Sequence, residues 1–287
     1  MMHVPEPTTH VSDTDLGDSG TVFDHNPPQP GLRLLHVGNH LVEQRWDQAT
    51  ICNPFWRIYL TDRDGVSLSH QGQHLAYRPD RLMVIPAWCP FIFHADTTVR
   101  HAFIHYELVA MPGVLVRRLF PAPRHIDDPN LLIRIRHWAR ALMARGRVDA
   151  ALAAEAAGLA LLVNATMLRD HDPMISGAPW RCLGEALHLV DERLDRTISV
   201  ADLARSLNCS PTHCIRLFRR HLGQTPTRYI IERRVTRAAE LLLDRHLGLD
   251  AIANRCGLGN RHYLSRVFTR HMGIGPAAYR RRHLDIA

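Results

Sequence analysis

The sequence predicts an α+β protein of several domains, in which a β-rich N-terminal part precedes a C-terminal part made only of helices. Residues 31–127 are short apolar runs separated by turn residues, whereas the apolar spacing from residue 128 onward is that of helices. The segment RLFRRHLGQTPTRY at 216–229 recurs fifty positions later as RVFTRHMGIGPAAY at 266–279, with seven of fourteen residues identical. A duplicated helical unit is therefore expected at the C-terminal end.

Residues 1–30 are rich in Pro, Asp, Thr and His and poor in large apolar side chains, which predicts a flexible N-terminal arm. They carry neither the basic nor the apolar segment of a secretory signal. The apolar run AALAAEAAGLALLVNA is interrupted by Glu155, so a buried helix is expected there and no membrane span. The six cysteines form no C-x-x-C pair, as expected of free thiols in a cytoplasmic protein.

The segments of residues 31–127 are five to eight residues long and are broken by Asp-Gly, Gln-Gly, Arg-Pro-Asp and Cys-Pro. That pattern is typical of an antiparallel sandwich or barrel. Residues 128–172 then predict a hairpin of two helices, because apolar residues recur at 4-3-4 spacing at Leu131, Ile135, Trp138 and Leu142. The stretch HDPMISGAP, with two prolines and a glycine, predicts a linker over 173–180.

Each copy of the repeat follows a short helix and a tight turn. In the first copy, Ser210 and Pro211 are suited to begin a second helix that Gly223 ends. In the second copy, Gly273 takes the same place as the stop. Two short helices joined by a turn of three or four residues, the second rich in arginine, form a helix-turn-helix. Two such motifs in register favour a duplicated DNA-binding unit over a purely structural helical repeat.

The stretch between the motifs, PTRYIIERRVTRAAELLLD, predicts one long connecting helix. Its about nineteen residues would extend roughly 28 Å at 1.5 Å per residue. Major-groove faces on one side of B-DNA recur about every 34 Å. A rigid spacer of this length is expected to hold the second helices of both motifs in consecutive grooves.

Charge is divided unevenly along the chain, and all 35 basic residues are arginine. Residues 180–287 hold 19 arginines against 10 acidic residues, a net charge of +9, whereas residues 1–179 hold 16 against 18, a net charge of −2. The basic C-terminal end suits a polyanion, although a solvated basic surface alone would give the same count.

Residues 195–283 resemble the C-terminal domain of the AraC/XylS family of bacterial transcription regulators. The resemblance rests on the run A-x-x-x-x-x-S-P-x-x-x-x-R-x-F from Ala204, on LGQTP, on RVTRAAELL, on IANRCG and on GPAAYR. It spans about ninety residues. Cys214, Leu258 and Leu264 depart from the family pattern at positions of the apolar core. The resemblance implies an AraC-type DNA-binding domain over 181–287.

Helical spacing separates the DNA-facing side chains from an apolar stripe of Cys214, Leu217 and Phe218 in the first motif and Leu264, Val267 and Phe268 in the second. Base edges are met by the N-terminal residues of a recognition helix. With the resemblance, this predicts base contacts from Thr212, Ile215, Arg216, Arg261, His262, Ser265 and Arg266, and phosphate contacts from Arg219, Arg220 and Arg270. For Ile215 two roles stay open, contact with a thymine methyl group and packing between helices.

The N-terminal half resembles, on the stretch RPDRLMVIPAWCPFIFH, the cupin-like sensor and dimerisation region of the same family. Phe91 stands where a metal-binding cupin would carry His, which counts against a metal enzyme. An effector pocket needs apolar walls with a few polar groups. The expected lining is Trp56, Arg57, Tyr59, Trp88 and Phe93, unless these aromatic residues only pack in the core.

Histidines offer a second interpretation of the same half. His101 and His105 lie on one face of a strand, and Glu107 follows them, so metal binding or acid–base catalysis stays an alternative to histidines of the core or surface.

The sequence thus predicts a transcription regulator that binds double-stranded DNA and is controlled by a small-molecule effector in a barrel over residues 31–127. We expect no enzyme activity, cofactor or metal, and a cytoplasmic homodimer formed through the hairpin over 128–172, with RNA polymerase as a partner if the protein is an activator. The alternatives are an effector-independent regulator and a metal-dependent cupin enzyme fused to a DNA-binding domain.

Overall fold

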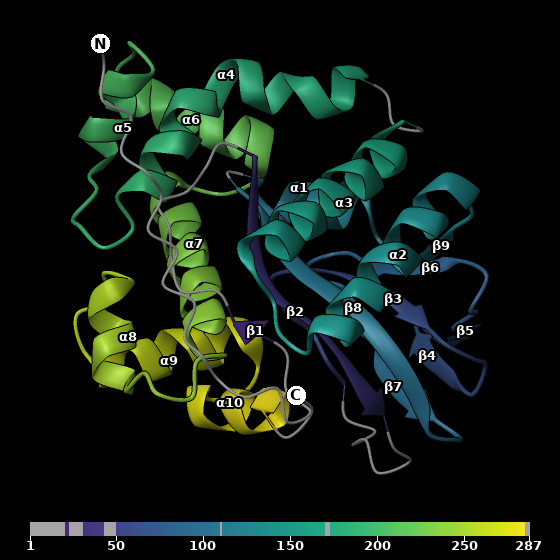
Figure 1. Ribbon diagram of the computed structural model, residues 1–287. Helices are drawn as coiled ribbons and strands as arrows, with labels where there is room; N and C mark the ends of the chain where they lie inside the picture. Colours follow the sequence, from purple (N-terminus) through teal and green to yellow (C-terminus); the bar gives the residue numbers. More distant parts are fainter. Residues whose placement is uncertain (1–20, 23–30, 43–49, 110, 170–172, 285–287) are drawn as a thin grey trace, which may run out of the picture.

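The computed structural model describes residues 21–22, 31–42, 50–109, 111–169 and 173–284 (Figure 1). It has a sheet-rich N-terminal region and a helical C-terminal region, as predicted. In Figure 1, helices α2 and α3 cover one side of the main sheet, and the long helix α7 stands beside the sheet near the start of β2.

The sheet-rich region consists of two antiparallel sheets. The larger has the strand order β1-β2-β8-β3-β6-β9 and the smaller the order β5-β4-β7. The strands are β1 (Thr21–Val22), β2 (Leu32–Val42), β3 (Trp56–Thr61), β4 (Val66–His70), β5 (Gln73–Ala76), β6 (Leu82–Ile85), β7 (Ile92–Ala95), β8 (Val99–Leu108) and β9 (Arg124–Ile126). Between the sheets lies an apolar core that includes Leu68, Ile85 and Phe93. The short alternating segments of the sequence therefore form the predicted sheets.

Helices cover the outer face of the larger sheet: α1 (Gly113–Leu119), α2 (Pro129–Arg145) and α3 (Ala150–Leu168). The predicted hairpin is confirmed. Its two helices begin at the capping carboxylates of Asp128 and Asp149, which accept backbone N–H groups of Leu131 and Leu152. By length and composition α3 is also apolar enough to cross a membrane. Here it lies on the sheet, with Leu159 and Val163 fully buried.

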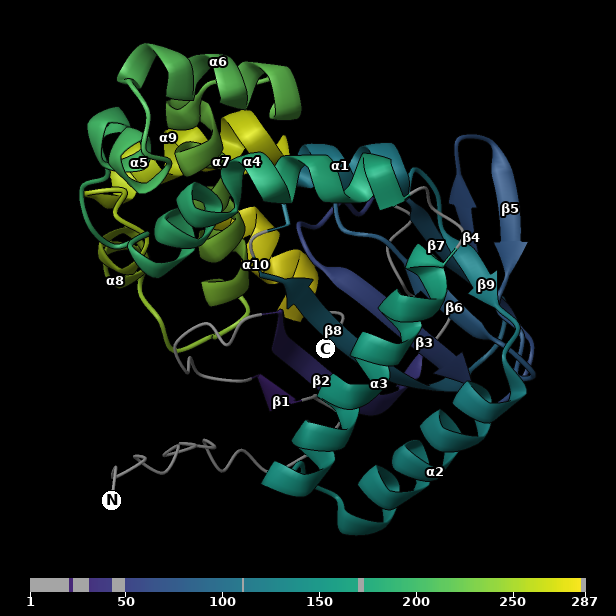
Figure 2. The same ribbon diagram turned by 90° about the horizontal axis from the view of Figure 1, so that it is seen from above.

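The C-terminal region contains α4 (Pro173–Glu192), α5 (Val200–Ser206), α6 (Pro211–Leu222), α7 (Pro226–Leu241), α8 (Leu249–Arg255), α9 (Arg261–Met272) and α10 (Pro276–Leu284). One apolar core joins α4, α5, α6 and the start of α7, and a second joins the end of α7 to α8, α9 and α10. Leu115 of α1 belongs to the first of these cores, and Figure 2 shows α1 beside α4. Helix α7 therefore connects two small units, each with a core of its own.

Two sequence-based expectations need correction, and a third concerns residues that lie mostly outside the described part of the chain. Residues 173–180, predicted as a linker, form the first turns of α4. Proline is compatible with the first position of a helix, because the backbone N–H that it lacks would have no hydrogen-bond partner within the helix. The predicted arm over 1–30 lies outside the described residues except for β1, which pairs with β2. Helix α7 has 16 residues, about 24 Å instead of the expected 28 Å, because the chain turns at Leu242 and Leu243.

Candidate nucleic-acid interface and sensor region

Helix α6 carries the first predicted DNA-facing surface. Ser210 caps its N-terminus by accepting the N–H of His213 at 3.2 Å, and Gly223 ends it in the left-handed conformation with φ of 65°. Cys214, Phe218 and Leu222 form its buried side, which packs on α4, α5 and α7. Leu217, expected in the apolar stripe, is half-buried. The opposite side of the helix is thus left exposed.

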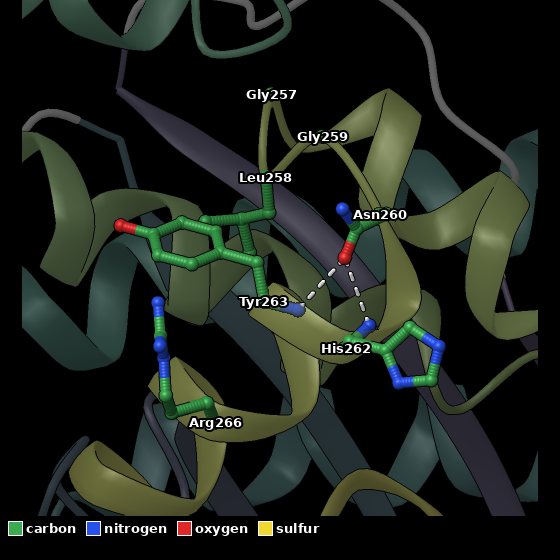
Figure 3. Close-up of a pocket in the computed structure, with 7 residues that line it drawn as sticks. All are labelled: Gly257, Leu258, Gly259, Asn260, His262, Tyr263 and Arg266. Atoms are coloured by element: carbon green, nitrogen blue, oxygen red, sulfur yellow. Dashed lines mark hydrogen bonds between the residues drawn. The ribbon is translucent and has the colours of Figure 1, made fainter.

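Helix α9 repeats this arrangement fifty residues later. Asn260 caps it by accepting the N–H groups of His262 and Tyr263 at 3.1 and 2.9 Å, as Figure 3 shows. Leu264, Val267 and Phe268 are its buried side, as predicted. A pocket opens at its N-terminal end, lined by Gly257, Leu258, Gly259, Asn260, His262, Tyr263 and Arg266.

The predicted DNA-contacting side chains lie on these two helices, on the sides that face away from the cores. The exposed members are Thr212, Arg216, Arg219, Arg220, Arg261, His262, Arg266 and Arg270. Ile215 and Ser265, which occupy equivalent positions, are half-buried. The exposed side of each helix is therefore polar and basic, and it includes one half-buried side chain, Ile215 in α6 and Ser265 in α9.

His213 and Tyr263, which the sequence analysis did not place among the DNA-contacting residues, each contact an arginine of this surface. Arg216 donates from Nη2 to Nδ1 of His213 at 2.7 Å. The guanidinium carbon of Arg266 lies 5.2 Å from the ring centroid of Tyr263. The spacing i, i+3 on a helix, which brings such side chains together, was the signal available in the sequence.

The space between the two sheets is partly polar. Histidines from β2 and β8 pack in pairs across the strands, with ring centroids 5.6 Å apart for His36 and His105 and 4.4 Å apart for His40 and His101. His36, His40 and His101 are buried, and His105 is half-buried. The hydroxyl of Tyr59 is hydrogen-bonded to Nε2 of His105 at 3.1 Å. Burial and the neighbouring His40 lower the pKa of His101 well below its usual value, so this ring stays neutral. Within the described part of the chain, no three His, Cys, Asp or Glu residues lie as a metal site requires.

The five predicted effector-pocket residues do not share one face. Arg57 and Tyr59 point between the sheets with Phe93, and the Arg57 guanidinium lies 4.6 Å from the Phe55 ring centroid. Trp56 points to the other face of β3, because side chains alternate along a strand, and packs against Tyr106 and Phe120. Trp88 lies outside the sheets, with its ring 5.5 Å from the Arg117 guanidinium.

A cluster of charged side chains joins the sheet-rich region to α4 and α7; we call it the junction cluster, and it consists of Arg33, Glu107, Asp191, Arg233, Arg237 and Glu240. Arg33 and Glu107 are cross-strand partners on β2 and β8 and form an ion pair. Arg33 also contacts Glu240 of α7 at 2.9 Å. From α7, Arg233 contacts Glu107 at 2.5 Å and Asp191 of α4 at 2.7 Å.

The junction cluster is largely removed from water, which sets its electrostatics. Burial opposes ionisation of Glu107, but Arg233 and Arg33 outweigh it and lower the Glu107 pKa to about 2. Burial, with the repulsion of Glu107, raises the Glu240 pKa to about 7 despite Arg33. Glu240 also pairs with Arg237 at 3.1 Å. Arg233 and Arg33 nevertheless hold Glu107 ionised, and its negative charge opposes a second one in the same buried site, so Glu240 is the carboxyl that takes up a proton.

The sequence interpretation did not anticipate the junction cluster. Charged residues inside apolar strands, such as Arg33 in LRLLHV and Glu107 in AFIHYELV, were the available signal. They are rarely buried unless they are paired.

Comparison with known proteins places these helices in a family. A family model described as a helix-turn-helix domain matches residues 203–282. The HTH-type transcriptional regulator Rv1931c of Mycobacterium tuberculosis is 37% identical over 119 residues, 42% of each chain. The HTH-type transcriptional activator RhaR of Cronobacter sakazakii is 34% identical over 122 residues, 40% of this chain and 42% of that one. The chain thus matches about two-fifths of the length of these relatives.

The fold of the whole chain also has a solved counterpart. The crystal structure of ToxT from Vibrio cholerae superposes with a TM-score of 0.51 over 88% of this chain and 98% of that one, at 11% identity. Such a low identity supports a shared fold and nothing finer. The family match on residues 203–282 is the more specific finding, and it identifies the C-terminal region of this chain as an AraC-type helix-turn-helix domain.

Proposed function

We propose that the protein is a sequence-specific DNA-binding transcription regulator controlled by a small-molecule effector. The observation that carries the proposal is the pair of capped helices α6 and α9, each with an exposed basic side, within a domain similar to that of HTH-type transcriptional regulators. Helices α5 and α6 form the first helix-turn-helix motif, and α8 and α9 form the second.

The two motifs contact successive segments of one DNA duplex. Each packs on its own core, and α7 separates them as a helix of about 24 Å. With the width of the packed helices added, this spacing suits major-groove faces that recur about every 34 Å. The operator is accordingly two different half-sites, about one helical turn apart.

Side chains near the start of each recognition helix contact bases, and those farther along contact phosphates. The base-contacting set is Thr212, Ile215, Arg216, Arg261, His262, Ser265 and Arg266. The phosphate-contacting set is Arg219, Arg220 and Arg270. Arginine pairs with the O6 and N7 atoms of guanine, which discriminates among bases by ~1–3 kcal/mol. Phosphate contacts give affinity without sequence preference.

The effector binds between the sheets of a cupin-like barrel. Arg57 is the cation that orients its carboxylate or hydroxyl groups, and Tyr59 and Phe93 supply the walls. Support comes from ToxT, which has been crystallised with an unsaturated fatty acid bound. The junction cluster carries the signal, because β2 and β8 line the barrel and also hold α7 through Arg33 and Glu107.

The protein functions as a homodimer in the cytoplasm. Helices α2 and α3 expose apolar side chains, with Ile133 63% and Met143 52% exposed on α2, and Leu161 49% exposed on α3. A second copy of the hairpin would cover them. RNA polymerase is a further partner if the protein activates transcription.

Selection of bound fragments from the source genome, followed by footprinting, tests the DNA-binding proposal. Two protected segments about one helical turn apart on the same side of the duplex are expected. Binding without sequence preference would overturn it. A thermal-shift screen with carboxylate and sugar ligands tests the effector, since a ligand that binds the folded state raises the melting temperature. Stoichiometric metal in the purified protein would instead favour the metal-dependent cupin enzyme.

A further inference from the structure

Arg216 and Arg266 occupy the same place in the two motifs. Each is the sixth residue of its helix, and the two are fifty positions apart. The third residue of each helix, His213 in α6 and Tyr263 in α9, lies one turn earlier on the same side. The two equivalent arginines thus have chemically different neighbours.

In the first motif, a hydrogen bond holds the arginine. Nη2 of Arg216 donates to Nδ1 of His213 at 2.7 Å. The imidazole is itself placed by the helix cap, because the backbone N–H of His213 donates to Ser210 at 3.2 Å. A ring nitrogen accepts only when it carries no proton, so this contact requires the neutral ring with its proton on Nε2. One of the five guanidinium N–H groups is used, and the others stay available.

In the second motif, an aromatic face holds the arginine. Arg266 extends alongside the Tyr263 ring, with 5.2 Å from the guanidinium carbon to the ring centroid (Figure 3). The ring is half-buried against the core of α7, α8 and α9, and the Tyr263 N–H is fixed by Asn260 at 2.9 Å. Arg234, a second arginine near this ring, donates to the carbonyls of Leu194 and Arg196 at 3.1 and 2.6 Å. This contact with the ring uses none of the Arg266 N–H groups.

We propose that His213 and Tyr263 are positioning residues, each of which orients its arginine toward one guanine in its own half-site. The proposal rests on the DNA-binding function proposed above and adds to it two specificity-determining residues outside the base-contacting set. A flexible arginine loses side-chain freedom when it binds a base, and a side chain that is already oriented loses less. Each half-site is therefore expected to contain one guanine whose recognition depends on the positioning residue of its own motif, His213 for the first half-site and Tyr263 for the second.

The test uses the full chain and the duplex that it selects from a random 40-base-pair library. Affinity is measured for that duplex and for versions with each guanine of each half-site replaced in turn. His213→Ala should reduce the preference for guanine in the first half-site by about 2- to 10-fold. His213→Asn, which keeps an acceptor near the position of Nδ1, should restore it. The preference in the second half-site serves as the internal control and should not change.

The second motif has its own matched variants. Tyr263→Phe keeps the ring and should keep the guanine preference, whereas Tyr263→Leu keeps apolar bulk without the ring and should lose about 2- to 10-fold in the second half-site only. Because Tyr263 also packs against the core, thermal unfolding of both variants is measured. Selective loss of preference in a variant that melts near the wild-type temperature cannot come from unfolding.

A double-mutant cycle separates positioning from direct base contact. In the background of Arg266→Ala, Tyr263→Leu should have no further effect on the guanine preference, and likewise His213→Ala in the background of Arg216→Ala. Full effects in those backgrounds would overturn the proposal. The proposal would also be overturned if Arg216→Ala and Arg266→Ala lost the guanine preference while His213→Ala and Tyr263→Leu kept it. That result would leave the proposed DNA-binding function intact. Failure of the chain to select any duplex would overturn both.

Discussion

Replacing Arg233 by methionine should weaken the attachment of α7 to the sheet-rich region. The Arg233 side chain is 5% exposed and lies between Glu107 and Asp191, whose side chains are 4% and 3% exposed. Methionine replaces the aliphatic stem of arginine but is shorter and carries no charge. Arg233→Met therefore leaves two carboxylates in a site from which water is excluded, where each was stabilised by the same cation.

The size of the effect follows from this burial. Removing one partner of a buried ion pair costs about 3–5 kcal/mol, because the remaining charge stays desolvated. In a chain of this size each 1 kcal/mol lowers the melting temperature by roughly 2–4 °C, so a fall of about 6–20 °C is expected. Arg33 still contacts Glu107, which places the effect toward the lower end. Calorimetry should also resolve separate transitions for the sheet-rich and helical regions, because their buried connection is weakened.

A matched control is available on the surface. Arg205 pairs with Asp202 at 2.9 Å, but its side chain is 76% exposed. Exposed ion pairs contribute about 0–1 kcal/mol, so Arg205→Met should change the melting temperature by at most a few degrees. Adding Asp191→Asn to Arg233→Met should recover part of the loss, since it removes the charge of the buried carboxylate that Arg233 contacts on α4. Equal effects of Arg233→Met and Arg205→Met would refute the assignment of a buried connection.

Other predictions concern pH, backbone geometry and specificity. With the Glu240 pKa raised from 4.5 to about 7 by burial and Glu107, the folded state holds a proton that the unfolded state has released. Stability should fall as the pH rises from about 4.5 through 7, and Glu240→Gln should remove this step in melting curves. Gly257→Ala should destabilise the fold more than Gly259→Ala: both glycines have positive φ, but only at 257 would the new methyl group meet a backbone carbonyl, that of Leu194 at 2.3 Å. Arg266→Ala should weaken binding to the selected duplex more than to random duplex, whereas equal losses would make Arg266 a phosphate contact.

Local features of the C-terminal region could be predicted because their causes are close in sequence. A cap such as Ser210 and a stop such as Gly223 act within one helical turn, so the bounds of α6 and α9 follow from nearby residues. The buried side of α9 follows in the same way from apolar spacing. Pro173 was a less certain signal, because proline is compatible both with a linker and with the first turn of a helix.

The sheet-rich region and the junction cluster depend on contacts between distant residues. Every residue of β3 except Tyr59 is buried, so the sequence could not separate the face of Trp56 from the face of Arg57. Arg33 and Glu240 are 207 positions apart, and no local pattern relates them. The sequence therefore indicates which charges are unusual, and the fold determines which of them meet.

The central claim, that α6 and α9 bind a specific DNA sequence, is tested most directly by the affinity of the full chain for two duplexes at one fixed salt concentration. One is the duplex selected from a random library, and the other has the same length and base composition in shuffled order. Binding to the selected duplex is predicted to be tighter by a factor on the order of 1,000 or more, which is typical of the affinity of such proteins for specific over non-specific sites. Equal affinity for the two duplexes would contradict the claim.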